Sequence, residues 1–130
     1  MLASINYKMN YEFIQKDEIQ ILKVDNLMLD YENRQLLRLV ESKIEDEFRY
    51  FIIDLSQLKF INSVGLSFLI AVLTKSRNMG GETIITSVSE KIAQLLAITK
   101  LKSIFIASSN LEEGIEAMQN LVNHQQVPAK

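Results

Sequence analysis

Residues 50–70 read YFIIDLSQLKFINSVGLSFLI, and this stretch decides the fold class. Its beginning, residues 50–55, is apolar on both faces until Asp54, which is typical of a parallel strand covered on both sides and predicts the centre of a sheet. Its end carries apolar side chains at the spacing of one helix face. The polar pair Asn62 and Ser63 interrupts the apolar residues where the predicted strand and its loop give way to the predicted helix.

Upstream of this stretch, the sequence predicts a hairpin followed by a helix. Apolar and polar residues alternate over residues 5–13, the period of a strand with one buried face, and residues 19–24 suggest its antiparallel partner. Turn residues at 16–17 separate the two strands. A helix is then predicted from Asp30, which we interpret as its N-cap, to about Glu47.

Downstream, helices and strands alternate to the C-terminus. The predicted elements are a helix that ends near Asn78 before Gly80 and Gly81, a strand at residues 82–88, a helix capped by Ser89, a short strand at residues 104–106, and a helix that starts at Asn110 with Glu113 three residues on. This order predicts an α/β fold: a single-layer, mostly parallel sheet with an antiparallel N-terminal edge strand, packed against about four helices. We expect one domain at residues 1–122 and a flexible C-terminal tail at residues 123–130.

The composition excludes several classes of protein. With 130 residues, 48% of them hydrophobic and 23% charged, the chain is typical of one globular domain. Its net charge of -2 argues against nucleic acid as a partner, because there is no excess of Lys and Arg to neutralise phosphates. Cysteine is absent, and the sequence shows neither a signal peptide nor an apolar run of about 18 residues. We therefore expect a cytoplasmic protein without direct membrane insertion.

No catalytic or cofactor motif is complete. A nucleophile elbow around Ser63 needs a glycine two positions away on each side, and Gly65 fits whereas Ile61 does not. The only histidine, His124, lies in the predicted tail, so a serine nucleophile lacks a base. One histidine without cysteine gives no metal-ligand pattern, and no glycine-rich phosphate loop occurs. We expect no enzymatic activity, no metal and no cofactor.

Asp54 has two interpretations. An aspartate that closes the central strand of an α/β domain of this size suggests the phosphoacceptor of a response-regulator receiver. That chemistry needs further acidic residues at the end of the first parallel strand to hold magnesium, and the sequence offers no such pair. The alternative is a turn-forming carboxylate that accepts backbone N–H groups in DLSQL, residues 54–58.

Ser63 stands where a strand leads through a loop into a helix, the end of a parallel sheet that usually carries function. We interpret Ser63 as the helix N-cap, a role that contributes roughly 1 kcal/mol. A phosphate on its hydroxyl would add about -1.5 to -2 charges, and a helix N-terminus tolerates anions. The neighbours Val64, Gly65 and Leu66 are small or apolar and suit the docking of another protein.

The chain resembles a STAS domain of the bacterial anti-sigma factor antagonist family. The matching stretches are IIDLSQLKFINSVGLSFLI at residues 52–70, LMLD at 27–30, NMGGE at 78–82 and SVSEKIAQLLAITKLKSIF at 87–105. The resemblance covers nearly the whole chain, and the family's order of elements is the order predicted above.

This resemblance implies a partner switch that is not an enzyme. The unmodified protein would bind an anti-sigma factor that is also a serine kinase, phosphorylation would break the complex, and a serine phosphatase would reset it. Asp30 matches the acidic residue that opens the family's first helix, close to the same surface. On the matching positions, the resemblance implies phosphorylation at Ser63 and a partner-binding neighbourhood of Asp30, Asn62, Ser63, Val64, Gly65 and Leu66.

Two positions depart from the family pattern. Asn62 stands where the family usually has Asp, and the glycine that usually precedes the LD of the first helix start is absent, with Leu27 in that region. If Ser63 is not phosphorylated, the same fold could serve as a constitutive antagonist, a stressosome-like scaffold or a regulatory subunit of a transport system. The first strand, at the edge of the predicted sheet, leaves room for a homodimer.

Overall fold

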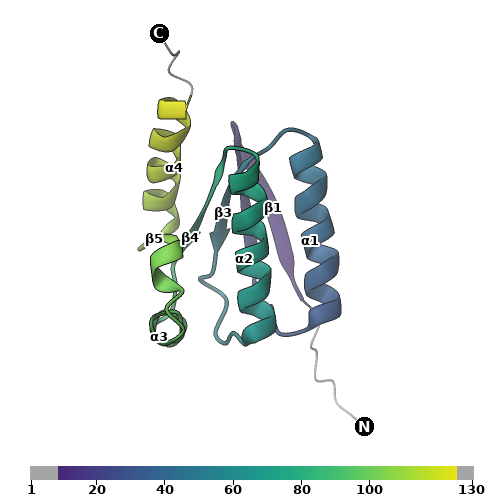
Figure 1. Cartoon of the computed structure of the whole chain (residues 1–130), viewed down its shortest axis with the longest axis vertical. Helices are drawn as coiled ribbons and strands as arrows, with labels where there is room; N and C mark the ends of the chain where they lie inside the picture. Colours follow the sequence, from purple (N-terminus) through teal and green to yellow (C-terminus); the bar gives the residue numbers. More distant parts are fainter. Residues whose placement is uncertain (1–8, 126–130) are drawn as a thin grey trace.

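The computed structural model describes residues 9–125, which form one five-stranded sheet with its covering helices (Figure 1). In chain order, the elements are β1 (Tyr11–Lys16), β2 (Ile19–Val24), α1 (Asp30–Glu45), β3 (Tyr50–Asp54), α2 (Ser63–Asn78), β4 (Glu82–Thr86), α3 (Glu90–Ile98), the 3-10 turn η1 (Lys102–Ile104), β5 (Ile106–Ser108) and α4 (Leu111–Gln125).

The strand order in the sheet is β1-β2-β3-β4-β5. β1 and β2 pair antiparallel, and each later pair is parallel. Every residue of the central strand β3 is buried, as its apolar run predicts. The predicted fold class is therefore confirmed, including the antiparallel edge strand at the N-terminal side.

A hydrophobic cluster lies on each face of the sheet. On one face, Phe51 and Ile53 of β3 pack with apolar side chains of α1, α2 and α3. On the other face, Tyr50 and Ile52 pack with Met118 of α4. Because successive side chains of a strand point to opposite faces, β3 needs apolar residues at both odd and even positions to contribute to both clusters.

The starts of three helices gather at one end of the molecule. Figure 1 shows α1 and α2 side by side, with their N-terminal ends at the same end of the molecule as α3. These helices follow the parallel strands β2, β3 and β4. The loops at residues 25–29, 55–62 and 87–89 therefore lie beyond the carboxyl ends of the strands, where ligands and partners of parallel sheets usually bind.

The N-terminal hairpin differs from its prediction in the bounds of its first strand and of its turn. β1 covers Tyr11–Lys16 instead of residues 5–13, of which residues 5–8 lie outside the described part of the chain. The turn falls at residues 17–18 instead of 16–17, because Lys16 pairs with Ile19. Asp17 adopts a φ of 53°, a left-handed conformation that short polar side chains tolerate and that closes the turn.

The last strand begins later than predicted. β5 covers Ile106–Ser108, whereas the sequence pattern predicts residues 104–106. Lys102–Ile104 forms a 3-10 turn, and the Ile104 carbonyl accepts a hydrogen bond from Arg77 Nη2 at 2.9 Å. The segment predicted as the start of the strand instead forms this turn and contacts α2.

Two other predicted element ends, those of α1 and β4, differ from the ends in the structure. α1 ends at Glu45, and Glu47 beyond it has a φ of 75°. β4 ends at Thr86, because Ser87 has a φ of 59°, outside the range of a strand. α4 ends at Gln125, and the division into a domain at residues 1–122 and a tail at residues 123–130 stays a prediction.

Candidate functional site

Asn62, and not Ser63, caps α2. Asn62 has an extended backbone (φ -121°, ψ -173°), and its Oδ1 accepts a hydrogen bond from the Gly65 backbone N–H at 2.9 Å. This geometry satisfies one of the free N–H groups of the first helical turn. The prediction that Ser63 is the cap is therefore wrong by one residue.

Ser63 is the first residue of α2 and is exposed. Within the described residues, its hydroxyl makes no hydrogen bond to protein. The first turn of α2 contains no acidic side chain. The hydroxyl is thus accessible at the positive end of a helix whose partial charge no carboxylate of that turn offsets.

A hydrogen-bond network joins this helix start to the loop before α1. Asn62 Nδ2 donates to the Met28 carbonyl at 3.2 Å. Asn33, in the first turns of α1, is buried, and its Nδ2 donates to the Leu27 carbonyl at 2.8 Å and to the Val64 carbonyl at 3.4 Å. The two amide side chains fix the positions of the loops on either side of Ser63.

Asp30 lies on the same end of the molecule but is not an N-cap. Leu29 occupies the cap position of α1 and makes no side-chain hydrogen bond to the helix. Asp30 is the first helical residue, is exposed, and forms an ion pair with Arg34 Nε at 3.1 Å. A carboxylate in the first turn still interacts favourably with the helix dipole, so the sequence signal for a helix start is right although the role is wrong.

Gly65 and Leu66 support the surface from beneath. A Cβ at Gly65 would lie 2.6 Å from Ile61 Cγ1 and 2.9 Å from the Leu27 carbonyl oxygen, so only glycine fits there without a shift. Leu66 is 7% exposed and belongs to the core. Val64 is half-buried. Of the predicted partner-binding residues, Asp30 and Ser63 are exposed, Asn62 and Val64 are half-buried, and Gly65 and Leu66 are buried.

Exposed apolar side chains lie in and beside the loops at the Ser63 end of the molecule, and the sequence patterns missed them. Met28 and Leu29 in the loop before α1 are 40% and 41% exposed, and Tyr31 and Phe60 are 63% and 60% exposed. For Met28, Leu29 and Phe60 the available signal is their position, since large apolar residues in a loop beyond a strand end have no helix or strand face to bury. Such residues commonly mark a protein-binding surface.

The family assignment follows from a family model, the STAS domain, which matches residues 10–116. The chain belongs to the STAS domain family. Among the described residues of this STAS domain, no helix combines the length and the apolar character needed to cross a membrane.

Three solved structures are similar to most of this STAS domain. A candidate anti-sigma factor antagonist from Thermotoga maritima has a TM-score of 0.77 at 19% identity and covers 84% of this chain and 94% of its own. An anti-sigma factor antagonist from Mycobacterium paratuberculosis has a TM-score of 0.76 at 20% identity, with 90% and 99% covered. The cell fate determinant SpoIIAA of Bacillus, in its phosphorylated form, has a TM-score of 0.66 at 14% identity, with 83% and 98% covered. At these identities, the likeness shows a shared fold.

Asp54 of the STAS domain forms a turn. It is 6% exposed, and its Oδ1 accepts a hydrogen bond from the Ser56 backbone N–H at 2.9 Å. This hydrogen bond confirms the prediction that Asp54 forms a turn in DLSQL, residues 54–58. No group of three or more acidic or histidine side chains in the described part of the chain could hold a metal ion.

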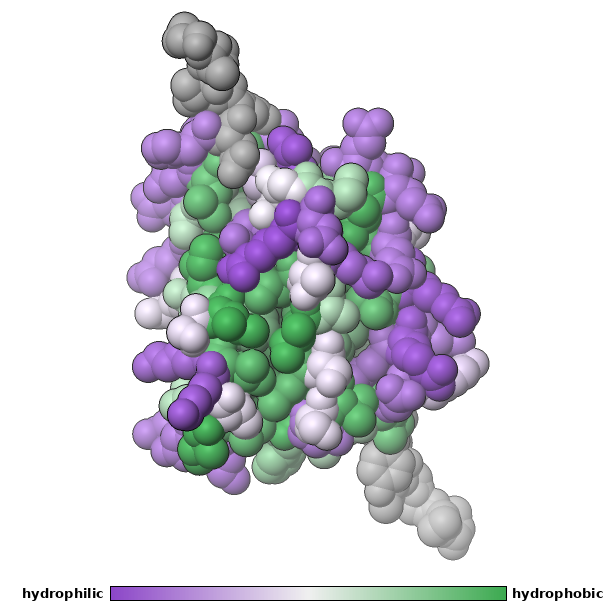
Figure 2. Space-filling model, in the orientation of Figure 1, coloured by the Kyte–Doolittle hydropathy of each residue, from purple (hydrophilic) through white to green (hydrophobic). Residues whose placement is uncertain are grey.

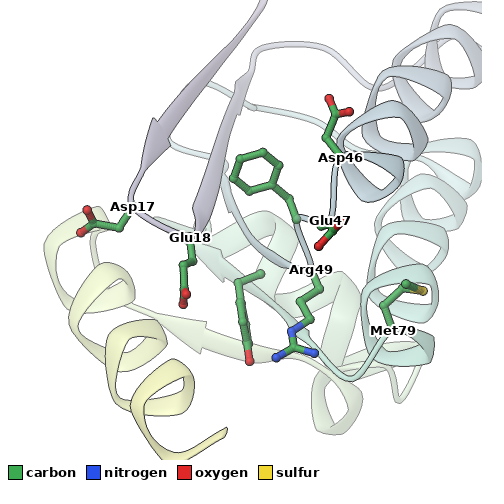
Figure 3. Close-up of a pocket in the computed structure, with 8 residues that line it drawn as sticks. Asp17, Glu18, Asp46, Glu47, Arg49 and Met79 are labelled. Atoms are coloured by element: carbon green, nitrogen blue, oxygen red, sulfur yellow. The ribbon is translucent and has the colours of Figure 1, made fainter. Parts of the chain in front are cut away.

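A hollow of about 570 Å³ lies at the opposite end of the STAS domain from Ser63, near the amino ends of the parallel strands (Figure 3). Its lining includes four acidic residues and one basic residue, namely Asp17, Glu18, Asp46, Glu47 and Arg49. In Figure 3, the carboxylates of Asp17 and Asp46 point away from each other. The acidic side chains therefore do not converge on one point, and we assign no site there.

Proposed function

We propose that this STAS domain is an anti-sigma factor antagonist that acts by binding and not by catalysis. Its partner is an anti-sigma factor that is also a serine kinase. The binding surface is the end of the molecule around Ser63, Asn62 and Asp30. Phosphorylation of Ser63 releases the partner, a serine phosphatase restores binding, and the domain itself needs no cofactor.

One observation carries this proposal: the exposed Ser63 hydroxyl begins α2 without a hydrogen bond to the rest of the described chain. A kinase can reach such a hydroxyl without unfolding the helix. Transfer of a phosphoryl group from ATP would form a bond to Ser63 Oγ and break the bond to ADP, and the hydroxyl proton would pass to a base of the kinase. The fold would gain a charge without losing a contact.

The electrostatics of the helix start support the proposal. A phosphoserine brings about -1.5 to -2 charges, and a helix N-terminus stabilises an anion by roughly 0.3–1 kcal/mol at an exposed position. Asn62 adds to this tolerance because it caps the helix without a charge, whereas the Asp usual in the family would repel the phosphate. The phosphate therefore changes the surface that a partner meets and leaves the scaffold intact.

The relatives add support of a general kind. Two of the similar structures carry the description of anti-sigma factor antagonists, and SpoIIAA was solved in a phosphorylated form. That fold therefore accommodates a phosphate in SpoIIAA. The partner and the modified residue of this chain are our inference from its own surface.

The test is phosphorylation and binding with the anti-sigma factor kinase of the host. The full chain is incubated with that kinase and ATP, and the phosphate is mapped by mass spectrometry. Ser67, one helical turn after Ser63 and also exposed, provides the matched control. We expect Ser63→Ala to abolish the phosphate, Ser67→Ala to leave it, and Ser63→Glu to weaken kinase binding about tenfold or more because a charge enters the interface.

Phosphate at another residue, or binding that Ser63→Glu leaves at the level of the original protein, would contradict the switch. Unchanged binding by Ser63→Glu would favour the phosphorylation-independent alternative, a STAS scaffold or a regulatory subunit. Circular dichroism and thermal melts of each variant show that any loss of binding is not a loss of fold.

A further inference from the structure

A groove runs between the loop before α2 and the outer side of α3. It has a volume of about 310 Å³ and is lined by Lys59, Phe60, Ile61, Lys91, Ile92, Gln94, Leu95 and Ile98. The loop residues that form one wall lead directly into Asn62 and Ser63. The groove is thus continuous with the surface of the proposed switch and was not found from the sequence.

Two large apolar side chains that line this groove are exposed to solvent. Phe60 is 60% exposed and Ile98, the last residue of α3, is 77% exposed. Figure 2 shows hydrophobic side chains at the surface of the end of the molecule where α3 lies. A groove with exposed apolar walls, next to a proposed switch, suits an apolar side chain from another protein.

The charges along this groove have one sign. Lys59 and Lys91 line it, and no carboxylate does. The Lys91 ammonium on the α3 side lies 5.3 Å from the centre of the Phe60 ring on the loop side, so a cation–π contact joins the two walls. The chain as a whole carries a net charge of -2, which makes this basic lining a local feature. Carboxylates are the groups that complement it.

We propose that this groove binds an acidic amphipathic segment of the partner protein. Apolar side chains of the segment pack against Phe60 and Ile98, and its carboxylates pair with Lys59 and Lys91. The identity of the partner rests on the proposed function above. The arrangement also supplies a physical reason for release: a phosphate on Ser63, three residues after Phe60, places negative charge beside an acidic segment and repels it.

The test uses two synthetic helical peptides that share one leucine face and carry either Glu or Lys on the flanks of that face. Each is titrated into the isotopically labelled full chain, and binding is followed by the chemical shifts of backbone and methyl groups. We expect the Glu peptide to shift the signals of Phe60, Lys91 and Ile98 and to leave Met79 at the opposite end unchanged. The Lys peptide is expected to bind at least several-fold more weakly.

Charge-reversal variants test the proposed contacts. We expect the double variant Lys59→Glu and Lys91→Glu to weaken binding of the Glu peptide about tenfold, as two partly exposed ion pairs become repulsive. Lys16→Glu, a charge reversal at the opposite end of the sheet, is the matched control and is expected to leave binding unchanged. Ser63→Glu is expected to weaken the Glu peptide several-fold.

Several outcomes overturn the inference. Equal binding of both peptides, shifts that map outside the groove, or self-association of the chain through Phe60 and Ile98 without peptide would each do so. A kinase that responds to Ser63→Glu but binds the double variant as tightly as the original protein overturns the groove and leaves the proposed function standing. Peptide binding in the groove together with a kinase whose binding is unchanged by Ser63→Glu supports the groove and overturns the proposed function.

Discussion

Asn62 Nδ2 donates a hydrogen bond to the backbone carbonyl of Met28 at 3.2 Å, while the Oδ1 atom of the same amide caps α2. One side chain therefore fixes both the start of a helix and the distance to a loop from a different part of the chain. A carboxylate at this position could accept from the helix but could not donate to a carbonyl. The amide thus explains in structural terms what an Asn offers where the family usually has Asp.

The cap predicts a difference between two neighbouring residues. Asn62→Ala should lower the free energy of unfolding by about 1–2 kcal/mol, because it removes the cap and the bond to Met28. Ser63→Ala should change it by less than about 0.5 kcal/mol, because the Ser63 hydroxyl has no protein partner among the described residues. Urea unfolding of both variants checks this. A larger cost for Ser63→Ala would show that the serine is the cap.

A negative charge should be tolerated at the start of α2 and not at its end. Ser63→Glu is expected to leave the melting temperature unchanged or slightly higher, because the helix dipole favours an anion there by roughly 0.3–1 kcal/mol. Asn78→Glu places the same charge at the last, exposed residue of α2 and should destabilise by a similar amount. Thermal melts at low and high salt measure the difference, which salt should reduce. Equal effects at both ends would contradict the role of the dipole.

Asn33 is expected to hold the surface in place. Asn33→Ala should cost about 2–3 kcal/mol, because the carbonyls of Leu27 and Val64 lose their donor and a void forms between the loops. Asn33→Asp keeps the shape but cannot donate to either carbonyl when ionised, so it should cost at least as much at neutral pH. Denaturant unfolding measures both. If Asn33→Leu were as stable as the original protein, the hydrogen bonds would not be what matters at this position.

Gly65 should not accept a methyl group. Gly65→Ala is expected to destabilise by about 1–3 kcal/mol, because the new Cβ would meet Ile61 and the Leu27 carbonyl oxygen, and backbone atoms yield poorly. Ser67→Ala on the exposed side of the same helix should stabilise slightly, as helix propensity alone would predict. Comparing the two by urea unfolding separates contact from propensity. A stabilising Gly65→Ala would mean that the loop moves away at little cost.

The buried hydroxyl pair between α2 and β4 predicts strong coupling. Ser76 Oγ lies 2.7 Å from Thr83 Oγ1, and both residues are fully buried. Ser76→Ala or Thr83→Val alone should cost about 0.5–1.5 kcal/mol, because the bond between the hydroxyls is lost while the remaining hydroxyl keeps a backbone carbonyl, Val72 at 3.5 Å or Leu73 at 3.0 Å. The double variant should cost clearly less than the sum of the two. Additive single effects in a double-mutant cycle would show that the pair is not a unit.

The sequence predicted the elements well where a local rule decides them. Ser89 caps α3 through a hydrogen bond from Ile92 N–H at 3.2 Å, and Asn110 accepts from Glu113 N–H at 2.8 Å before α4, both as the local patterns predict. Gly80 adopts a φ of 80° after α2, as the stop signal requires. These interactions lie within a few residues, so the sequence contains all their atoms.

The sequence predicted the structure less well where contacts between distant residues determine it. Arg77 donates to the carbonyl of Ile104, which lies in the 3-10 turn before the last strand, and no local pattern around residue 104 contains Arg77. Asn62 and Ser63 are both good capping residues, and the Asn62 that caps α2 also bonds the Met28 carbonyl, which lies far away in the chain. The groove joins Phe60 to Ile98, two exposed residues that lie far apart in the chain.

The amino-acid sequence by itself determined the order of strands and helices, the buried centre of the sheet and the family resemblance, because periodicity, capping and turn chemistry act over a few residues. The tertiary structure alone decided which hydroxyl or amide caps α2, which side chains near Ser63 reach solvent, and which lysines and apolar residues line one groove. The physical reason is that exposure and pairing between distant segments depend on packing, and packing is a property of the whole chain.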